Sequence, residues 1–168
     1  MSQRILIRQH AVNRNIVATV RTEAGDAISL LAFQILRLSA DIASVGDELA
    51  KPAGQTSARW QVLAAADHEP STVADIARAL ALTRQSVQRV ADLLATEKLV
   101  KYEDNPAHQR ARLVRLTSGG SNALHSVQAA QTKWANALAK QLNIDDVVRA
   151  SGTLEQIMNM LRSCTHQS

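Results

Sequence analysis

The chain has 168 residues and a formal net charge of +4 at pH 7, and 46% of its residues are hydrophobic. These values fit one folded domain of ordinary size rather than a disordered chain, and the basic balance favours an acidic partner such as nucleic acid. The single cysteine, Cys164, excludes an internal disulfide, and no apolar run approaches the roughly 18 residues of a membrane-spanning helix.

The first 22 residues are basic, because they hold four arginines and the first acidic residue is Glu23. An arginine-rich start without acids is also a property of transit peptides, although this stretch lacks their enrichment in serine. Its apolar residues fall roughly on one helical face, at Ile5, Val12, Ile16 and Val20. We expect residues 1–26 to form a basic helical extension that packs on a dimer and is separated from the next helix at Gly25-Asp26.

A long amphipathic helix is predicted next, because apolar residues recur in alternating steps of three and four over three heptads. This seam consists of Ile28, Leu31, Ile35, Leu38, Ile42, Val45 and Leu49. Leu30 and Phe33 add apolar surface that one small domain would struggle to cover. We therefore expect a second copy of the same helix as the partner of this seam.

Three helix-breaking residues, Gly46, Pro52 and Gly54, are expected to end this helix. Thr56 then offers the N-cap of a second helix, which is expected to end near His68.

The segment from Ser71 to Thr117 contains two further helices joined by a tight turn. Thr72 can cap the first of them, with Asp75 completing a capping box. The apolar pattern breaks at Ala81-Leu82, and Thr83 offers the N-cap of a helix from Arg84 to Glu97. Its inward-facing residues are predicted to be Val87, Val90, Ala91 and Leu94.

The outward face of this helix is polar. It presents Arg84, Gln85, Ser86, Gln88, Arg89 and Asp92. Arginine can donate two hydrogen bonds to guanine O6 and N7, glutamine can read adenine N6 and N7, and serine can contact bases or phosphates. A polar helix face can also be merely solvated, so these residue types alone leave both interpretations open.

Two short segments after this helix, residues 99–103 and 112–116, alternate apolar and polar residues with period two. Residues 104–106, Asp-Asn-Pro, supply the turn chemistry between them, so the pattern predicts a hairpin. From Arg84 to Thr117 the chain has seven basic and four acidic residues, and Arg110 and Arg112 lie at the hairpin loop. A basic loop beside a helix with an Arg, Gln and Ser face is typical of a DNA-binding module.

The C-terminal part is predicted to form two more helices. Thr117 can cap a long helix with a near-heptad stripe at Leu124, Val127, Trp134, Leu138 and Leu142. Asp145-Asp146 can begin a last helix, which carries Val148, Leu154, Ile157, Met158 and Leu161. Helices with broad apolar faces at both ends of the chain predict a dimerisation domain built from both ends.

The chain resembles the MarR (multiple antibiotic resistance regulator) family of winged helix-turn-helix transcription factors from about Leu30 to the C-terminus. The matching motifs are Trp60-Gln61-Val62-Leu63, residues 72–77, residues 86–90 with Leu94, Leu99-Val100 and residues 113–120, LVRLTSGG. The resemblance implies a mainly α winged-helix fold, of the α+β kind, with a two-stranded wing between flanking helices. We therefore expect a DNA-binding winged helix-turn-helix over residues 55–117 and a helical dimerisation domain from residues 27–54 and 118–168.

Two departures from the family pattern concern the recognition helix and the wing. The family usually has glycine where Lys98 stands, so Lys98 is expected to adopt a left-handed conformation. The family also has an Asp-x-Arg wing where this chain has residues 108–110, His-Gln-Arg. His108 thus removes the acidic partner that would orient the wing arginine.

The site residues follow from the helix face and from the resemblance. For DNA binding, we predict Thr83, Arg84, Gln85, Ser86, Gln88 and Arg89 in the recognition helix and His108, Gln109, Arg110 and Arg112 in the wing. Relatives commonly release DNA when a small aromatic or phenolic anion binds between the dimerisation helices and the winged domain. By resemblance, Arg59, Trp60 and His68 lie near such a region; alternatively, Trp60 is core and the other two are surface residues.

The sequence offers nothing to an enzyme, a metal or a cofactor. The five histidines make no i,i+3 or i,i+4 pair, and no phosphate loop, nucleophile elbow or triad order is present. Cys164 lies two residues before His166, but two ligands near a chain end make a poor metal site, and an inert thiol is the simpler interpretation. We expect a cytoplasmic protein without a membrane partner.

The leading hypothesis is a homodimeric, sequence-specific transcriptional regulator that binds a pseudo-palindromic operator in double-stranded DNA, acting as a repressor that a small effector releases. The alternative is a winged-helix adaptor that binds other proteins and no specific DNA sequence. Arg84, Gln85, Gln88 and Arg89 favour the first, because an adaptor surface would present apolar or aromatic anchors.

Overall fold

The computed structural model describes residues 21–108 and 110–165. They belong to two compact units, of which the first ends at Ser39 and the second begins at Ala40. The helical extension expected from the apolar pattern of residues 5–20 lies outside the described residues.

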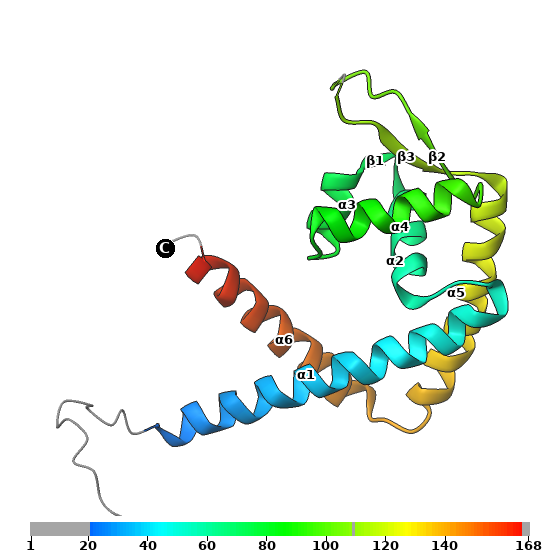
Figure 1. Ribbon diagram of the computed structural model, residues 1–168. Coiled ribbons are helices and arrows are strands. Elements are labelled where there is room, and N and C mark those ends of the chain that lie inside the picture. Colours follow the sequence, from blue (N-terminus) through cyan, green and yellow to red (C-terminus); the bar gives the residue numbers. More distant parts are fainter. Residues whose placement is uncertain (1–20, 109, 166–168) are drawn as a thin grey trace, which may run out of the picture. The chain divides into compact units, whose positions relative to one another are not determined.

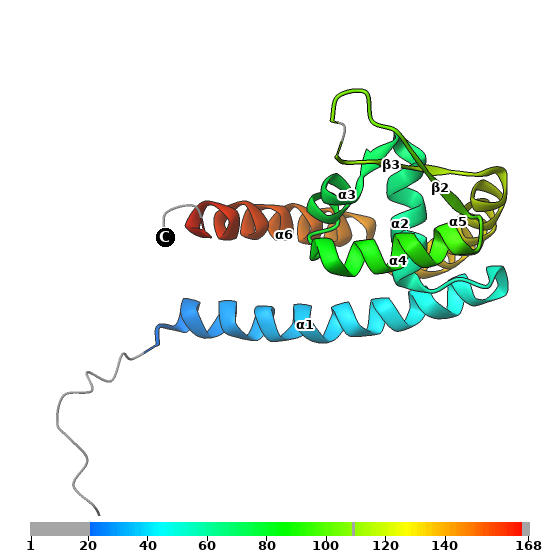
Figure 2. The same cartoon turned by 45° about the horizontal axis from the view of Figure 1, so that its top comes forward.

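The described chain is mainly helical, with one small sheet (Figure 1). In order, the elements are α1 (Glu23–Ala50), the 3-10 turn η1 (Lys51–Ala53), α2 (Ser57–His68), β1 (Ser71–Thr72), α3 (Val73–Ala79), α4 (Arg84–Thr96), β2 (Val100–Glu103), β3 (Leu113–Leu116), α5 (Ser118–Ala139) and α6 (Ile144–Thr165). The winged helix-turn-helix fold class predicted from the sequence is confirmed. Figure 2 shows the same elements from a second direction, and in both views the loop between β2 and β3 projects beyond α3.

The sheet has three antiparallel strands in the order β1-β3-β2, one more than the expected two-stranded wing. The hairpin pairs Tyr102 with Val114 and Lys101 with Arg115. The extra strand, β1, pairs Ser71 with Val114. A strand of two residues has no alternation that a sequence pattern could reveal, and its pairing with β3 comes from the tertiary structure alone.

The core of the second unit is aliphatic, and α2 lies at its centre, in contact with α3, α4, α5 and β3. Its fully buried large side chains are Val62, Leu63, Ile76, Val87, Leu94, Val100, Val114, Leu124 and Val127. Burial of these side chains anchors α4 and the wing on α2 and α5. The polar face of α4 is therefore turned away from the core.

Threonine caps begin four of the helices, as the sequence predicts. The hydroxyl of Thr83 accepts a hydrogen bond from the Ser86 amide at 3.1 Å, and Thr117 accepts one from the Gly120 amide at 3.1 Å. Thr56 caps α2 in the same way. At α3 the capping box is complete, because Thr72 accepts from the Asp75 amide at 3.2 Å and donates to the Asp75 carboxylate at 2.6 Å. The hydroxyl contact is the main reason that the pKa of Asp75 is lowered.

Two expectations about α1 are wrong. Gly25 and Asp26 do not form a boundary between helices, because they lie in the first turn of α1. The Thr22 hydroxyl accepts a hydrogen bond from the Gly25 amide in this turn at 3.1 Å. Gly46 does not end the helix either. It is buried within α1, and a Cβ atom there would lie 2.7 Å from Ser57 Oγ, so its role is close packing against the start of α2.

The recognition helix ends on a left-handed residue that is not glycine. Lys98 has φ of 59°, which confirms the conformation predicted for it. The Leu99 amide donates to the Leu94 carbonyl at 2.9 Å and the Lys98 amide to the Ala95 carbonyl at 3.0 Å. These two bonds form a Schellman motif, which satisfies carbonyls at the helix end.

The segment Glu23–Ala53, which joins α1 and η1, is long and apolar enough to cross a membrane, with a mean hydropathy of 1.5 over 18 residues. This corrects the expectation that no such run is present. Arg37 and Asp41 lie near its middle, where charges are costly in a bilayer. These two charges lie beside the apolar seam and make the helix a poor match for the interior of a bilayer.

Candidate nucleic-acid interface

Helix α4 presents its polar side chains to solvent because its opposite face is fixed in the core. Val87, Ala91 and Leu94 are buried, so the positions between them and the first turn of the helix are left on the exposed side. Those that are exposed are Thr83, Arg84, Gln85, Ser86, Arg89 and Asp92, while Gln88 is partly exposed. Thr83 and Ser86 are joined in the helix cap, so their position is set by the start of the helix itself.

The wing and α4 come together in a groove. A cavity of about 340 Å³ is lined by Arg84 and Gln88 of α4 and by Arg110 and Arg112 of the hairpin loop. Residues 72–74, at the start of α3, form another wall. The recognition helix and the wing, which are separate segments of the sequence, thus share one basic concavity. On the outer side of α4, Gln85 and Arg89 line an adjoining hollow together with Arg84 and Gln88.

A hydrogen-bonded triad joins α4 to strand β2. Gln88 Nε2 lies 2.8 Å from Asp92 Oδ1 and 2.9 Å from the Tyr102 hydroxyl, and that hydroxyl donates to Asp92 Oδ1 at 2.7 Å. Burial, and then the hydrogen bond to Asp92, raises the pKa of Tyr102 to about 12. Tyr102 was not selected as a site residue from the sequence. The i,i+4 spacing of Gln88 and Asp92 is a usable signal, but the place of Tyr102 beside them depends on the hairpin.

Tyr102 also orients Arg112. The Arg112 guanidinium donates from Nη2 to the Tyr102 carbonyl oxygen at 2.9 Å, and its Cζ lies 5.4 Å from the centre of the Tyr102 ring. This is the distance of a cation–π contact. Tyr102, an aromatic residue of the wing strand, therefore orients Arg112, which is not the arginine of the His-Gln-Arg motif at residues 108–110.

The remaining wing residues differ in how free their charges are. His108 and Arg110 are exposed, and Gln109 lies outside the described residues. Lys101 Nζ and Arg115 Nε lie 2.8 and 2.6 Å from the Glu103 carboxylate, whose pKa they lower. Within residues 21–108 and 110–165, the guanidinium groups of Arg84, Arg89 and Arg110 form no hydrogen bond or ion pair. These three side chains are therefore available to a phosphate backbone.

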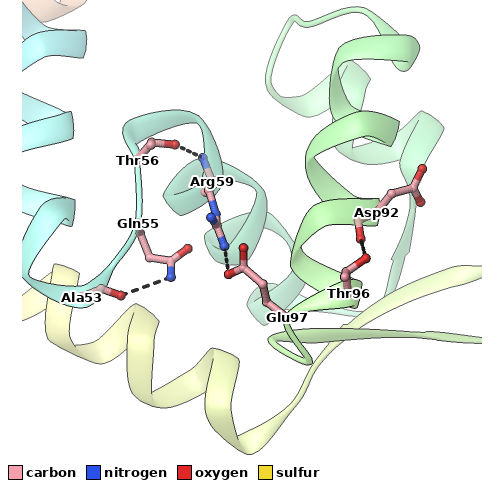
Figure 3. A network of polar contacts seen from close by, with 7 residues as sticks. All are labelled: Ala53, Gln55, Thr56, Arg59, Asp92, Thr96 and Glu97. Carbon is pink, nitrogen blue, oxygen red and sulfur yellow. Dashed lines mark hydrogen bonds and ion pairs between the residues drawn. The ribbon is translucent and has the colours of Figure 1, made fainter.

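The residues proposed for an effector separate into two places. Trp60 and His68 line a cavity of about 780 Å³ between α2, α3 and the part of α1 that follows Ser39. Arg59 is absent from its lining. Instead, Arg59 forms an ion pair with Glu97, the C-cap residue of α4, as Figure 3 shows. Two acidic residues, Glu69 and Asp75, also line the cavity, and His68 is the one basic residue among its described lining residues.

No group of three or more His, Cys, Asp or Glu side chains that could hold a metal ion occurs within the described part of the chain.

Known proteins share this fold and parts of this sequence. Residues 53–111 match the sequence profile of the MarR family. An uncharacterised protein of Mycobacterium tuberculosis is 34% identical over 114 residues, which are 68% of this chain and 80% of that protein. A mutant of MarR from E. coli, solved in complex with operator DNA, has a TM-score of 0.69 at 23% identity and matches 81% of this chain and 99% of its own. CouR from Rhodococcus jostii, solved with bound p-coumaroyl-CoA, has a TM-score of 0.67 at 19% identity over 76% and 90% of the two chains.

Proposed function

This chain belongs to the MarR family of transcription regulators and has its DNA-binding winged-helix fold. We therefore propose that it is a homodimeric, sequence-specific repressor that a small ligand releases from DNA. Members of the family regulate transcription and are not enzymes. The single observation that carries the proposal is the groove that Arg84 of α4 and Arg110 of the wing both line. It supplies a helix for base edges and a loop for the backbone, on one face.

The dimensions of the DNA grooves determine which contacts α4 and the wing can each make. A helix fits the major groove of B-DNA, where arginine and glutamine distinguish base pairs, so α4 is the reading element. A basic loop reaches the neighbouring minor groove or phosphates, which fix the register without reading sequence. Arg84 and Arg89 are therefore assigned to bases or adjacent phosphates, and Arg110 to the backbone or minor groove.

The homodimer rests on apolar surface that the single chain leaves open. Large apolar side chains along α1 and α6 are more than half exposed, and they include Ile28, Phe33, Leu38, Val148 and Leu161. A soluble monomer rarely exposes so many large apolar groups along whole helices. We assign residues 27–54 and 118–168 to a dimerisation domain that buries them against a second copy. The cytoplasm is the compartment in which such a regulator meets its operator.

A dimer of this kind predicts the form of its operator. Two recognition helices related by a two-fold axis enter successive major grooves about 34 to 36 Å apart. The operator is accordingly an imperfect palindrome whose half-sites are about one helical turn apart.

The effector site that we propose is the cavity lined by Trp60 and His68. Its other walls include Ile42, Ile76 and Leu80, which suit a small, mostly apolar or aromatic molecule. A relative of the same fold, CouR, binds an aromatic acyl thioester, p-coumaroyl-CoA. Because the cavity lies between α1, α2 and α3, a ligand can release DNA if it prefers a helix arrangement other than the one that DNA selects. An anionic group would pair with His68, since Arg59 is paired with Glu97.

Selection of random duplexes on the purified protein tests this proposal. We expect enrichment of one palindromic motif by wild type and its loss in an Arg84→Ala, Arg89→Ala double variant. Arg149→Ala is the matched control, because Arg149 is an exposed arginine of α6 outside the winged helix-turn-helix. Enrichment of no duplex, with the protein folded, would contradict the proposal and favour the adaptor alternative.

A further inference from the structure

The side-chain amide of Gln88 has a fixed orientation. Its nitrogen faces two oxygen atoms, Asp92 Oδ1 at 2.8 Å and the Tyr102 hydroxyl at 2.9 Å. An amide nitrogen has two hydrogens, and here each has an acceptor. The reverse orientation would place the amide oxygen against the Asp92 carboxylate, which can only accept, so the two oxygens would repel each other.

Tyr102 completes the arrangement because of the direction of its own hydrogen bond. The phenol has one hydrogen, which it donates to Asp92 Oδ1 at 2.7 Å, so toward Gln88 it can only accept. The raised pKa of Tyr102 means that this hydrogen is present at any physiological pH. The triad therefore uses every donor of Gln88 and of the Tyr102 hydroxyl, and it leaves Gln88 Oε1 without a role within the triad.

This orientation changes what Gln88 can read. A free glutamine recognises adenine with two bonds, accepting from N6 through its oxygen and donating to N7 through its nitrogen. In this chain the nitrogen is already occupied, and Gln88 lines the groove shared by Arg84 and Arg110. Only an acceptor is left for a base edge.

We propose that Gln88 acts as a pure hydrogen-bond acceptor in the major groove, and that it selects a base with an exocyclic amine, cytosine or adenine, at one position of each half-site. The inference rests on the proposed function, because it specifies how α4 reads DNA. Tyr102 and Asp92 are positioning residues: they contact Gln88 and determine which of its atoms faces the base.

The experiment is a selection of random duplexes with four proteins: wild type, Gln88→Ala, Tyr102→Phe and the control Gln128→Ala, which alters an exposed glutamine of α5. For wild type we expect one position per half-site at which cytosine and adenine are both accepted, and guanine and thymine bind about two- to tenfold more weakly, the range of one hydrogen bond. Gln88→Ala should accept all four bases there, while the rest of the motif is kept. Gln128→Ala should select the wild-type motif.

The contact between Gln88 and Tyr102 is tested by Tyr102→Phe together with a modified base. Phenylalanine keeps the ring under Arg112 and removes only the hydroxyl, which frees one hydrogen of the Gln88 amide. We expect this variant to favour adenine over cytosine at the same position. Replacing that adenine by 7-deazaadenine, which lacks the N7 acceptor, should leave wild-type affinity unchanged and weaken Tyr102→Phe about two- to tenfold.

The outcomes separate this inference from the function on which it rests. A wild-type motif that demands adenine and loses affinity with 7-deazaadenine would overturn the inference, and so would a motif that Gln88→Ala leaves unchanged; DNA binding would stand in both cases. If the folded wild-type protein enriches no duplex, the proposed function fails and the inference fails with it.

Discussion

Arg59 of α2 is paired with Glu97, the residue that caps the C-terminus of α4 (Figure 3). The Arg59 side chain is only 17% exposed and that of Glu97 is 46% exposed. The pair links the helix at the centre of the core to the end of the recognition helix. Its geometry explains why Arg59 does not reach the cavity lined by Trp60 and His68.

Arg59→Ala should therefore destabilise the protein. The change removes a partly buried charge pair and the packing of the arginine stem, and we expect a loss of about 1 kcal/mol in the free energy of unfolding. Arg149→Ala is the control, since the Arg149–Asp146 pair is exposed on both sides and should contribute close to nothing. Urea denaturation of both variants measures the difference. Equal midpoints for the two variants would show that the Arg59–Glu97 contact does not hold α4.

Gly120 should tolerate no side chain. A Cβ atom there would lie 2.0 Å from the Leu99 carbonyl oxygen, so the start of α5 would have to move away from the end of the recognition-helix segment. We expect Gly120→Ala to cost roughly 1 to 3 kcal/mol or more of stability. A Cβ atom at Gly152, in α6, would have no other atom within 4 Å. Gly152→Ala should therefore stabilise the protein by about 0.5 to 1 kcal/mol through helix propensity. Thermal unfolding of the two alanine variants measures the difference. Midpoints that shift in the same direction for both variants would contradict this account.

Lys98→Gly should stabilise the protein, because Lys98 has φ of 59° and glycine adopts that conformation without the Cβ penalty. The expected gain is about 1 kcal/mol. Lys140 caps α5 with φ of −68°, so Lys140→Gly should give no gain. Chemical denaturation distinguishes the two variants. A loss of stability in Lys98→Gly would mean that the lysine side chain contributes more than its backbone conformation costs.

Leu38→Asp should disrupt the homodimer. Leu38 is 53% exposed on the seam of α1, where a buried carboxylate from each copy would be costly. We expect monomer or aggregate in sedimentation at micromolar concentration, and a dimer for Ser39→Asp, which alters the neighbouring polar position. Wild type that sediments as a compact monomer would contradict the proposed assembly.

The helix starts were predictable from the sequence because their signals are local. Thr56, Thr72, Thr83 and Thr117 each bond an amide three residues ahead, so a short motif contains the whole interaction. The left-handed turn at Lys98 was predictable for the same reason, together with the family pattern.

The features that the sequence did not reveal depend on contacts between distant segments. Gly46 looks like a helix end in the sequence and is a close contact with Ser57 in the structure. Strand β1 exists only through its pairing with β3. In the candidate site, the face of α4 was predictable from its period, whereas the role of Tyr102 requires the hairpin to bring it beside Gln88 and Asp92.

The central claim is that α4 and the wing bind DNA together. The most direct test is the salt dependence of affinity for the selected duplex, measured for wild type, Arg110→Ala and Arg149→Ala. Each phosphate contact contributes about 0.9 to the slope of the logarithm of the binding constant against the logarithm of salt concentration. We predict a steep slope for wild type, a slope lower by about 0.9 with weaker binding for Arg110→Ala, and the wild-type slope for Arg149→Ala. Wild-type affinity and slope in Arg110→Ala would contradict the account of the groove.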